Sequence, residues 1–260
     1  MSCSICGGAL APIGSATLLG RHRVAYFRCT ACGYTCTEPP YWLDEAYAEA
    51  ITASDVGLVG RNLRLARVAR AVILAFFGPR GPFLDYGAGY GLLVRLLRDK
   101  GLDVHWHDPH SANLFAQCAP ADLSGATRYR LLTAFELFEH LPDPVAELTQ
   151  MLRLADSVLF STTLLPAHMP GPGGWWYYGL EHGQHVSLYT RRSLEALAAR
   201  FGLNLYSDGR ELHLMTPRRL PRGAFALATR PLVALLVDLL VRGRSLVPAD
   251  YQRVTGRPLG

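Results

Sequence analysis

Lysine is almost absent from this 260-residue chain: Lys100 is the only lysine among 26 lysines and arginines. Arginine has replaced lysine throughout, so a single arginine says little about a phosphate contact. The formal net charge is +5, and the segment from Pro217 onward contributes most of it, with eight arginines against Asp238 and Asp250. The rest of the chain is close to neutral, which weakens a nucleic-acid-binding interpretation.

The residue patterns of a secretory leader and of a membrane-spanning run are also not found. Residues 1–10 hold cysteines and glycines where a leader has a basic start and an apolar centre, so we expect no export and a cytoplasmic location. The longest apolar stretch, residues 225–241, is interrupted by Arg230, Pro231 and Asp238. It falls short of the roughly 20 apolar residues that a spanning helix needs, so we expect no transmembrane segment.

Half of the residues are apolar, which is enough for a sizeable buried core. We predict a zinc-ribbon module over 1–40, a helical connector over 41–80, an α/β domain over 81–216 and a helical tail over 217–260. Pro39-Pro40 and Gly78-Pro79 mark the first two boundaries. Arginines at every third position between 61 and 70 favour a solvent-exposed helix face.

From Gly81 onward, predicted strands alternate with helices, which favours a parallel sheet with helices on both faces. We predict strands over 83–86, 104–107, 129–135 and 157–163, and helices over 91–100, 111–117, 144–154 and 192–201. Asp208-Gly209 predicts a hairpin between strands at 203–206 and 211–215. No third strand can be assigned between Cys118 and Arg128.

The tail carries an apolar helix over about 231–241. Packing on the body of the same chain is the favoured interpretation, because most strongly apolar helices are buried. A membrane surface or a subunit contact is the open alternative. The sequence does not indicate the oligomeric state.

The most informative segment is Leu84-Asp85-Tyr86-Gly87-Ala88-Gly89-Tyr90-Gly91, in which an apolar strand leads into a glycine-rich turn. Glycines let the backbone approach a ligand closely, and the N-terminus of the following helix favours its polar end. About 20 residues later a second strand ends at Asp108, where a carboxylate would meet a pair of ribose hydroxyls. Dinucleotides require G-x-G-x-x-G, whereas this turn reads G-x-G-x-G, which disfavours a dinucleotide oxidoreductase.

The turn resembles motif I of class I S-adenosylmethionine methyltransferases, which have a Rossmann-like α/β fold. This resemblance implies that Gly87, Ala88, Gly89 and Gly91 lie under the methionine part of the cofactor. It also implies that Asp108 binds the ribose hydroxyls and that Asp85 helps to order the site.

The resemblance extends from about Gly81 to Met215. The segment 129–144, with its Glu-His-Leu-x-Asp-Pro signature, looks like the fourth-strand region of the subgroup related to ubiquinone-biosynthesis and sugar C-methyltransferases. It implies cofactor contacts for Phe135 and Glu136. Trp175-Trp176-Tyr177-Tyr178, followed by His182 and His185, resembles the substrate-loop motif of that subgroup. Arg130 stands where the family usually has an acid, and the third-strand region is compressed, so we assign no adenine contacts.

Cysteines cluster at the start of the chain, where five of the six lie within the first 36 residues. Cys3-x-x-Cys6 and Cys29-x-x-Cys32 have the paired spacing of a structural zinc site with four thiolates. In a chain that is not exported, this clustering favours a metal over disulfides. Cys36 is a spare thiol or an alternative ligand. The module resembles the zinc-binding N-terminal domain of certain sugar C-methyltransferases.

Methyl transfer requires an acceptor atom in line with the sulfonium methyl group, and a base is needed only when the acceptor keeps a proton. The candidates for this base are His140, Glu181, His182 and His185, because imidazole titrates near neutral pH. A histidine beside an aromatic loop can instead be a hydrogen-bonded scaffold residue. The aromatic residues 175–178 either wall the acceptor pocket or pack a lid.

We therefore expect an S-adenosylmethionine-dependent methyltransferase with a small-molecule acceptor, such as a sugar or a related metabolite, and a structural zinc. One alternative is an RNA or DNA methyltransferase that grips phosphates with the ribbon and the basic tail, although an Asn/Asp-Pro-Pro-Tyr/Phe base-flipping motif is missing. A second alternative is a non-catalytic adaptor with a decayed methyltransferase domain. The intact Asp85, glycine turn and Asp108 count against decay.

Overall fold

Residues 1–48 and 56–260 are described by the computed structural model, and the chain divides into two compact units. Unit 1 comprises Met1–Thr52, Glu136–Gln150 and Phe160–Arg218. Unit 2 comprises Ala53–Phe135, Met151–Leu159 and Arg219–Gly260. Each unit is therefore assembled from three separate stretches of the sequence.

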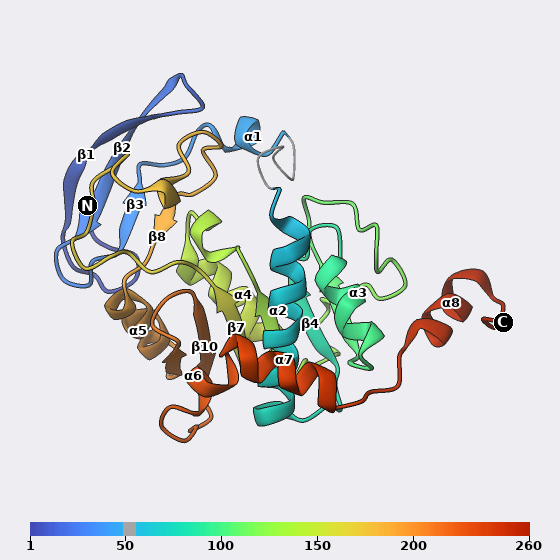
Figure 1. Cartoon of the computed structure of the whole chain (residues 1–260). Helices are drawn as coiled ribbons and strands as arrows, with labels where there is room; N and C mark the ends of the chain where they lie inside the picture. The colour runs from blue at the N-terminus through green and yellow to red at the C-terminus, as the bar shows by residue number, and fades with distance from the viewer. Residues whose placement is uncertain (49–55) are drawn as a thin grey trace. The chain divides into compact units, whose positions relative to one another are not determined.

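Parallel strands form the centre of unit 2 (Figure 1). They are β4 (Phe83–Tyr86), β5 (Val104–His107), β6 (Leu132–Ala134) and the first half of β7 (Val158–Ser161). β4 pairs in parallel with β5 on one side and with β6 on the other. Their apolar side chains, among them Leu84, Val104 and Leu132, are buried, as is typical of parallel strands covered on both faces. The strands predicted over 83–86 and 104–107 are confirmed.

The other two predicted strands of the parallel series are shorter than expected. The strand predicted over 129–135 is reduced to β6, and Tyr129 adds only an isolated parallel bridge to Ala155. The strand predicted over 157–163 is reduced to β7. Both predictions are therefore right in type and too long at their ends.

The helix predicted over 111–117 is not formed, so this prediction was wrong. The Asp108 carboxylate accepts two backbone N–H groups at the start of the segment. Within the segment, the N–H of Leu114 donates to the Tyr90 carbonyl. These donors bond to a side chain and to the glycine turn instead of to carbonyls four residues earlier, which is the pattern that a helix requires.

Unit 2 contains predicted helices and two that were not assigned individually. The predicted ones are α2 (Leu58–Val72), which continues into a π turn at Ile73–Phe77, α3 (Leu92–Asp99) and α7 (Pro231–Leu240). The additional ones are α6 (Ala224–Ala228) and α8 (Val247–Thr255), both in the tail. A further helix, α4 (Pro144–Leu154), begins in unit 1 and ends in unit 2. The helices predicted over 91–100, 144–154 and 231–241 are confirmed. Of the helical connector predicted over 41–80, α1 (Leu43–Ala46) and α2 are formed, and residues 49–55 lie outside the described residues.

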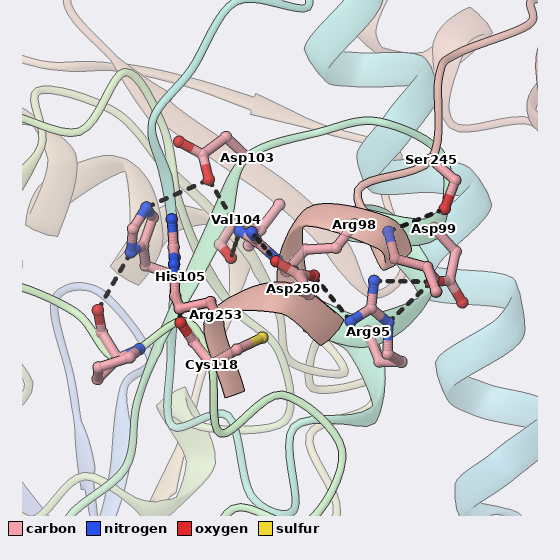
Figure 2. Close-up of polar contacts among 12 residues, drawn as sticks. Arg95, Arg98, Asp99, Asp103, Val104, His105, Cys118, Ser245, Asp250 and Arg253 are labelled. Carbon is pink, nitrogen blue, oxygen red and sulfur yellow. Dashed lines mark hydrogen bonds and ion pairs between the residues drawn. The ribbon is translucent and has the colours of Figure 1, made fainter. Parts of the chain in front are cut away.

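Buried ion pairs attach the C-terminal tail to helices α2 and α3 of the same unit. Arg70 of α2 is buried and donates a 3.2 Å hydrogen bond to Asp238 of α7. The sequence predicts a solvent-exposed face for the arginine row at 61–70. Arg70 departs from this prediction, because its guanidinium is buried against an acidic partner. Asp250 of α8 accepts two hydrogen bonds from Arg98 and one from Arg95, both on α3 (Figure 2).

An antiparallel sheet forms the N-terminal part of unit 1. Its strands, in spatial order, are β1 (Leu10–Leu18), β2 (His22–Cys29), β3 (Thr35–Thr37) and β8 (Ser187–Leu188). A core containing Trp42, Tyr26 and Tyr178 packs against it. The segment that bears the cysteines is thus completed by a strand from much later in the chain.

The rest of unit 1 follows the predicted order of elements. It contains α5 (Arg191–Arg200), β9 (Asn204–Ser207), β10 (Leu212–Thr216) and two short 3₁₀ turns at Phe138–His140 and Trp176–Tyr178. Thr190 and Ser193 form a capping box at the start of α5. β9 and β10 pair antiparallel, and the Asp208 carboxylate accepts three backbone N–H groups in the turn between them. The predicted helix at 192–201 and the predicted hairpin are confirmed.

The mixed sheet has the strand order β5-β4-β6-β7-β10-β9. β7 contributes residues to both units, and the β9–β10 hairpin forms one end of the order. Parallel strands alternating with helices, with an antiparallel hairpin at one edge, match the α/β, Rossmann-like fold of class I methyltransferases. The predicted fold class is confirmed. Among the described helices, none has the length and apolar character needed to cross a bilayer.

Candidate active site and cysteine cluster

The glycine turn of unit 2 has a backbone that only glycine adopts readily. Gly87, Gly89 and Gly91 all have positive φ, and Gly91 (φ +84°) caps the N-terminus of α3. A Cβ atom at Gly91 would lie 2.2 Å from the side-chain amide nitrogen of Asn113. The third glycine is therefore required by both its backbone conformation and the space around it.

Asp108 lies against this turn, as the sequence predicts for an acid at the end of the second strand. Its Oδ2 accepts a 2.7 Å hydrogen bond from the backbone N–H of Gly89. Its Oδ1 accepts backbone N–H groups from His110 and Ser111 at 2.8 and 2.9 Å. A carboxylate oxygen has two lone pairs, so Oδ2 of Asp108 can still accept a hydrogen bond from a ligand.

Asp85 is fully buried at the end of β4, immediately before the turn. The Thr133 hydroxyl on β6 donates a 2.6 Å hydrogen bond to its Oδ1. Burial, with a smaller contribution from the charge of Asp108, raises the pKa of the Asp85 carboxyl to about 7. Asp85 therefore links two strands under the turn, which fits a residue that orders the site.

Phe135 and Glu136 mark the point where the chain passes from unit 2 to unit 1. Glu136 has φ +51°, which is unusual for a residue with a side chain. Its backbone N–H donates a 2.8 Å hydrogen bond to the Ser161 hydroxyl, which in turn donates to its carboxylate. This closed pair of hydrogen bonds holds the strained backbone, a feature that clusters at functional sites. The cofactor contacts of Phe135 and Glu136 stay predictions.

His185, in unit 1, has a hydrogen bond that defines which of its ring nitrogens carries the proton. Its Nδ1 lies 2.6 Å from the Tyr177 carbonyl oxygen, which can only accept, so Nδ1 carries the proton and Nε2 is the basic nitrogen. Burial lowers the pKa of His185 to about 4. The ring also contacts His140 edge to face, with centroids 5.0 Å apart. A neutral imidazole with a defined basic nitrogen has the chemistry of a general base.

His140 and Glu139 lie beside His185. His140 Nδ1 is 2.9 Å from the Tyr47 hydroxyl. Glu139 is fully buried, and its Oε1 accepts a 2.7 Å hydrogen bond from the Tyr177 hydroxyl. Burial, followed by the charge of Glu136, raises the pKa of Glu139 to about 8. The sequence interpretation missed Glu139 as a site residue, although it is part of the Glu-His-Leu-x-Asp-Pro signature.

These three side chains could hold a cation. One ligand atom from each of Glu139, His140 and His185 lies within 4.8 Å of the others, and Glu139 Oε2 is buried without a hydrogen-bond partner. Two imidazoles and a carboxylate suit several divalent metals. The cluster therefore supports either proton transfer or metal binding.

His182 and Glu181 have different environments from His185. The Nδ1 of His182 accepts a hydrogen bond from the backbone N–H of Gln184, and its ring lies so close to Gly179 that a Cβ there would be 2.2 Å from Nε2. Burial lowers the pKa of His182. Glu181 is exposed. This geometry favours a scaffold role for His182. The catalytic roles of His182 and Glu181 stay predictions.

The aromatic run at 175–178 divides between core and surface. Tyr177 and Tyr178 are buried in the unit 1 core, where the Tyr178 hydroxyl donates to the Pro170 carbonyl. Trp176 is exposed. Tyr177 and Tyr178 thus pack and orient the neighbouring groups, whereas Trp176 is available to a ligand.

The N-terminal cysteines come together as their spacing predicts. The Sγ atoms of Cys3, Cys6, Cys29 and Cys32 all lie within 4.8 Å of one another. The distance is 3.8 Å from Cys3 to Cys32 and 3.4 Å from Cys6 to Cys29, close to the roughly 3.8 Å between sulfurs bound tetrahedrally to zinc at about 2.3 Å. Cys36 lies outside this group. The four thiols therefore fit a tetrahedral zinc ion.

Turn geometry holds the two cysteine pairs. The Gly33 N–H donates to the Cys29 carbonyl, and the Cys32 N–H points to the Cys29 sulfur at 3.5 Å. A Cβ at Gly8 would lie 3.0 Å from the Cys29 sulfur, so glycine is needed at this close approach. The Thr190 hydroxyl donates to the Cys32 carbonyl at 2.6 Å and so ties the second pair to the start of α5.

Comparisons with known proteins agree with the fold. A family model described as a methyltransferase domain matches residues 61–208, which is more than half of the chain. No curated protein matches the sequence.

Solved methyltransferase structures are similar to this chain at low sequence identity. The plantazolicin methyltransferase BpumL, in complex with a monoazolic desmethylPZN analog and SAH, is 14% identical with a TM-score of 0.50, over 68% of this chain and 93% of that one. The magnesium protoporphyrin IX methyltransferase of Synechocystis PCC 6803 with bound SAH is 15% identical with a TM-score of 0.45, over 68% and 95%. An O-methyltransferase family 2 protein from Planctomyces limnophilus, in complex with apigenin, is 14% identical with a TM-score of 0.48, over 67% and 66%. This chain therefore spans about two thirds of the length of the last protein.

The family match covers β4, the glycine turn, Asp108 and the segment that carries His140 and His185. On the evidence of this match and of the confirmed fold, the chain belongs to the class I S-adenosylmethionine-dependent methyltransferases.

Proposed function

We propose that this enzyme transfers a methyl group from S-adenosylmethionine to a small molecule, such as a sugar or a related metabolite. The observation that carries the cofactor assignment is the bond between the Gly89 N–H and the Asp108 carboxylate, which places an acid on the glycine turn. Asp108 would accept the ribose hydroxyls, and Gly87, Ala88, Gly89 and Gly91 would lie under the methionine part. Bound S-adenosylmethionine supplies the electrophilic methyl group.

Calorimetry with S-adenosylmethionine tests this assignment. We expect one site per chain and at least ~10-fold weaker binding in Asp108→Ala, since a hydrogen bond to a charged group contributes about 1.5–3 kcal/mol. Asp44→Ala, which removes an exposed acid from α1, is the matched control and should bind normally. Unchanged affinity in Asp108→Ala would exclude the ribose role.

For an acceptor that keeps its proton, we propose that His185 is the base. The hydrogen bond of its Nδ1 to the Tyr177 carbonyl supports this role because it fixes the tautomer in which Nε2 carries no proton. Burial lowers the pKa of His185 and so keeps the ring neutral at neutral pH. Glu139 and Tyr177 would position the cluster. The segments 129–144 and 175–185 resemble the ubiquinone-biosynthesis and sugar C-methyltransferase subgroup. This resemblance supports a small-molecule acceptor.

We also propose that Cys3, Cys6, Cys29 and Cys32 bind one structural zinc ion. The sulfur spacing supports four-thiolate coordination, which leaves no position for water and therefore no catalytic role for the ion. Such a reduced site suits the cytoplasm, which we propose as the location.

A further inference from the structure

Six apolar side chains on α7 and close to it in the sequence are exposed. The exposed fractions run from 43% to 76% for Leu227, Leu232, Leu236, Leu239, Leu240 and Val241. Four of them, Leu232, Leu236, Leu239 and Leu240, follow the spacing i, i+4, i+7 and i+8 along α7 and so share one side of the helix. We refer to these four residues as the leucine face.

The opposite side of α7 is fixed to unit 2. Ala234 is buried, and Asp238 pairs with Arg70 of α2 and with Lys100 after α3. α7 lies across α2 in Figure 1. A Cβ at Gly243 would lie 2.0 Å from the Lys100 carbonyl oxygen, so the chain after α7 is also in close contact with this turn.

These contacts determine which side of α7 faces solvent. Turning the helix to bury the leucines would break the Arg70–Asp238 pair and leave a buried guanidinium without its acid, which is strongly unfavourable. The ion pairs of Asp250 with Arg95 and Arg98 hold α8, the next helix, to α3 (Figure 2). The leucine face is therefore presented outward by a rigid support.

Arginines flank the leucine face in the sequence. The tail carries exposed arginines before α7, at each end of it and shortly after it, namely Arg219, Arg222, Arg230, Arg242 and Arg244. Between Pro217 and Arg244 the only acid is Asp238, and it is used in the inward ion pairs. The exposed charges of the tail between Pro217 and Arg244 are thus of one sign.

We propose that the leucine face docks on the surface of an anionic lipid bilayer. An apolar helix face bordered by arginines is the pattern of helices that lie in the plane of the membrane interface. The leucines would enter the boundary between headgroups and acyl chains, and the arginines would contact lipid phosphates. α7 has 10 residues and is about 15 Å long, which suits lying on a bilayer and not crossing it.

Charge argues against a second copy of this chain as the occupant. In a two-fold contact through α7, the same arginine-bordered surface would meet itself, which brings like charges together without an exposed acid on the helix to offset them. A bilayer with anionic headgroups has the opposite charge over the whole contact. The lipid surface is therefore the better complement.

Flotation of the full-length protein with vesicles tests the proposal. We expect at least ~10-fold more protein to float with vesicles of phosphatidylcholine and phosphatidylglycerol than with phosphatidylcholine alone, and this binding should weaken at high salt. The double variant Leu236→Gln/Leu240→Gln keeps good helix formers on exposed positions and should lose at least ~10-fold in binding. Leu123→Gln changes an exposed leucine outside the tail and is the matched control.

Three results would overturn the proposal. The first is wild-type protein that does not float with anionic vesicles. The second is equal flotation of wild type and the double variant, with melting temperatures that show both to be folded. The third is a wild-type dimer in sedimentation that the double variant converts to a monomer while neither protein floats, which would assign the leucine face to a second copy.

Discussion

The hydroxyl of Thr133 donates a 2.6 Å hydrogen bond to the carboxyl of Asp85 and thereby joins β6 to the end of β4. The carboxyl is fully buried directly before the glycine turn. Burial raises its pKa to about 7. The folded chain therefore keeps this proton up to about pH 7, whereas the unfolded chain loses it near pH 4.

Asp85 should make folding stability depend on pH with a defined sign. A carboxyl with a raised folded-state pKa contributes stability below its unfolded pKa and loses it as the pH rises to the folded value. We expect the free energy of unfolding of the wild type to fall, relative to Asp85→Asn, by up to about 4 kcal/mol between pH 4 and pH 7. Urea unfolding of both proteins across this range measures the difference. A difference that is flat or of opposite sign would contradict this assignment.

Zinc binding should depend on Cys29 and not on Cys36. Elemental analysis of protein purified without chelator should give about one zinc per chain, and Cys29→Ser should lose it because serine is a poor ligand for this ion. Cys36→Ser is a matched control, since Cys36 lies in the same sheet but outside the sulfur cluster.

Zinc loss should also loosen more than the N-terminal strands. Thr190 bonds to the Cys32 carbonyl, and the Tyr34 hydroxyl lies 2.6 Å from the Ser187 hydroxyl, so we expect faster amide exchange in β8 of Cys29→Ser as well. Zinc retained in Cys29→Ser, or lost equally in Cys36→Ser, would refute the ligand set.

His185 should be distinguished from His182 by kinetics. With a labelled methyl donor and the small-molecule fraction of a cell extract, we expect turnover of His185→Ala to fall by about 100-fold, with cofactor affinity nearly unchanged. His182→Ala should instead lower the melting temperature, with a turnover loss that follows the unfolded fraction, because His182 packs on Gly179 and caps a turn.

The pH profile provides an independent test of His185. A base must be neutral, and burial lowers the pKa of His185 to about 4, so turnover should be constant above about pH 5 and fall only below it. Loss of turnover already near pH 6.5, or normal turnover in His185→Ala, would remove His185 from the mechanism.

Local signals explain what the sequence predicts well. The glycine turn, the two cysteine pairs and the Asp208-Gly209 hairpin depend on residues that are close in sequence, and each is formed as expected. Backbone geometry and ligand spacing are encoded in such short segments. The pairing of β3 with β8 was not foreseen, since about 150 residues separate the two strands and β8 is only two residues long.

Side-chain environments in the core were the main source of error. Glu139 is buried against Tyr177, nearly 40 positions away, and no periodic pattern distinguishes it from an exposed acid. Arg70 belongs to a regular row of arginines yet is buried, because its partner Asp238 lies in the tail. The sequence of residues 111–117 also gives no sign that N–H groups in and just before this segment bond to Asp108 and to the glycine turn. The errors at Glu139 and Arg70 concern partners that are distant in sequence.

Transfer of a labelled methyl group tests the central claim most directly. Purified protein is incubated with methyl-labelled S-adenosylmethionine and a cell extract separated into small-molecule, nucleic-acid and protein fractions, with Asp108→Ala as the comparison. We predict label in the small-molecule fraction with the wild type and at least ~10-fold less with Asp108→Ala. Label confined to RNA or DNA would contradict the proposed acceptor class, and no transfer to any fraction by a protein that binds the cofactor would contradict the catalytic assignment itself.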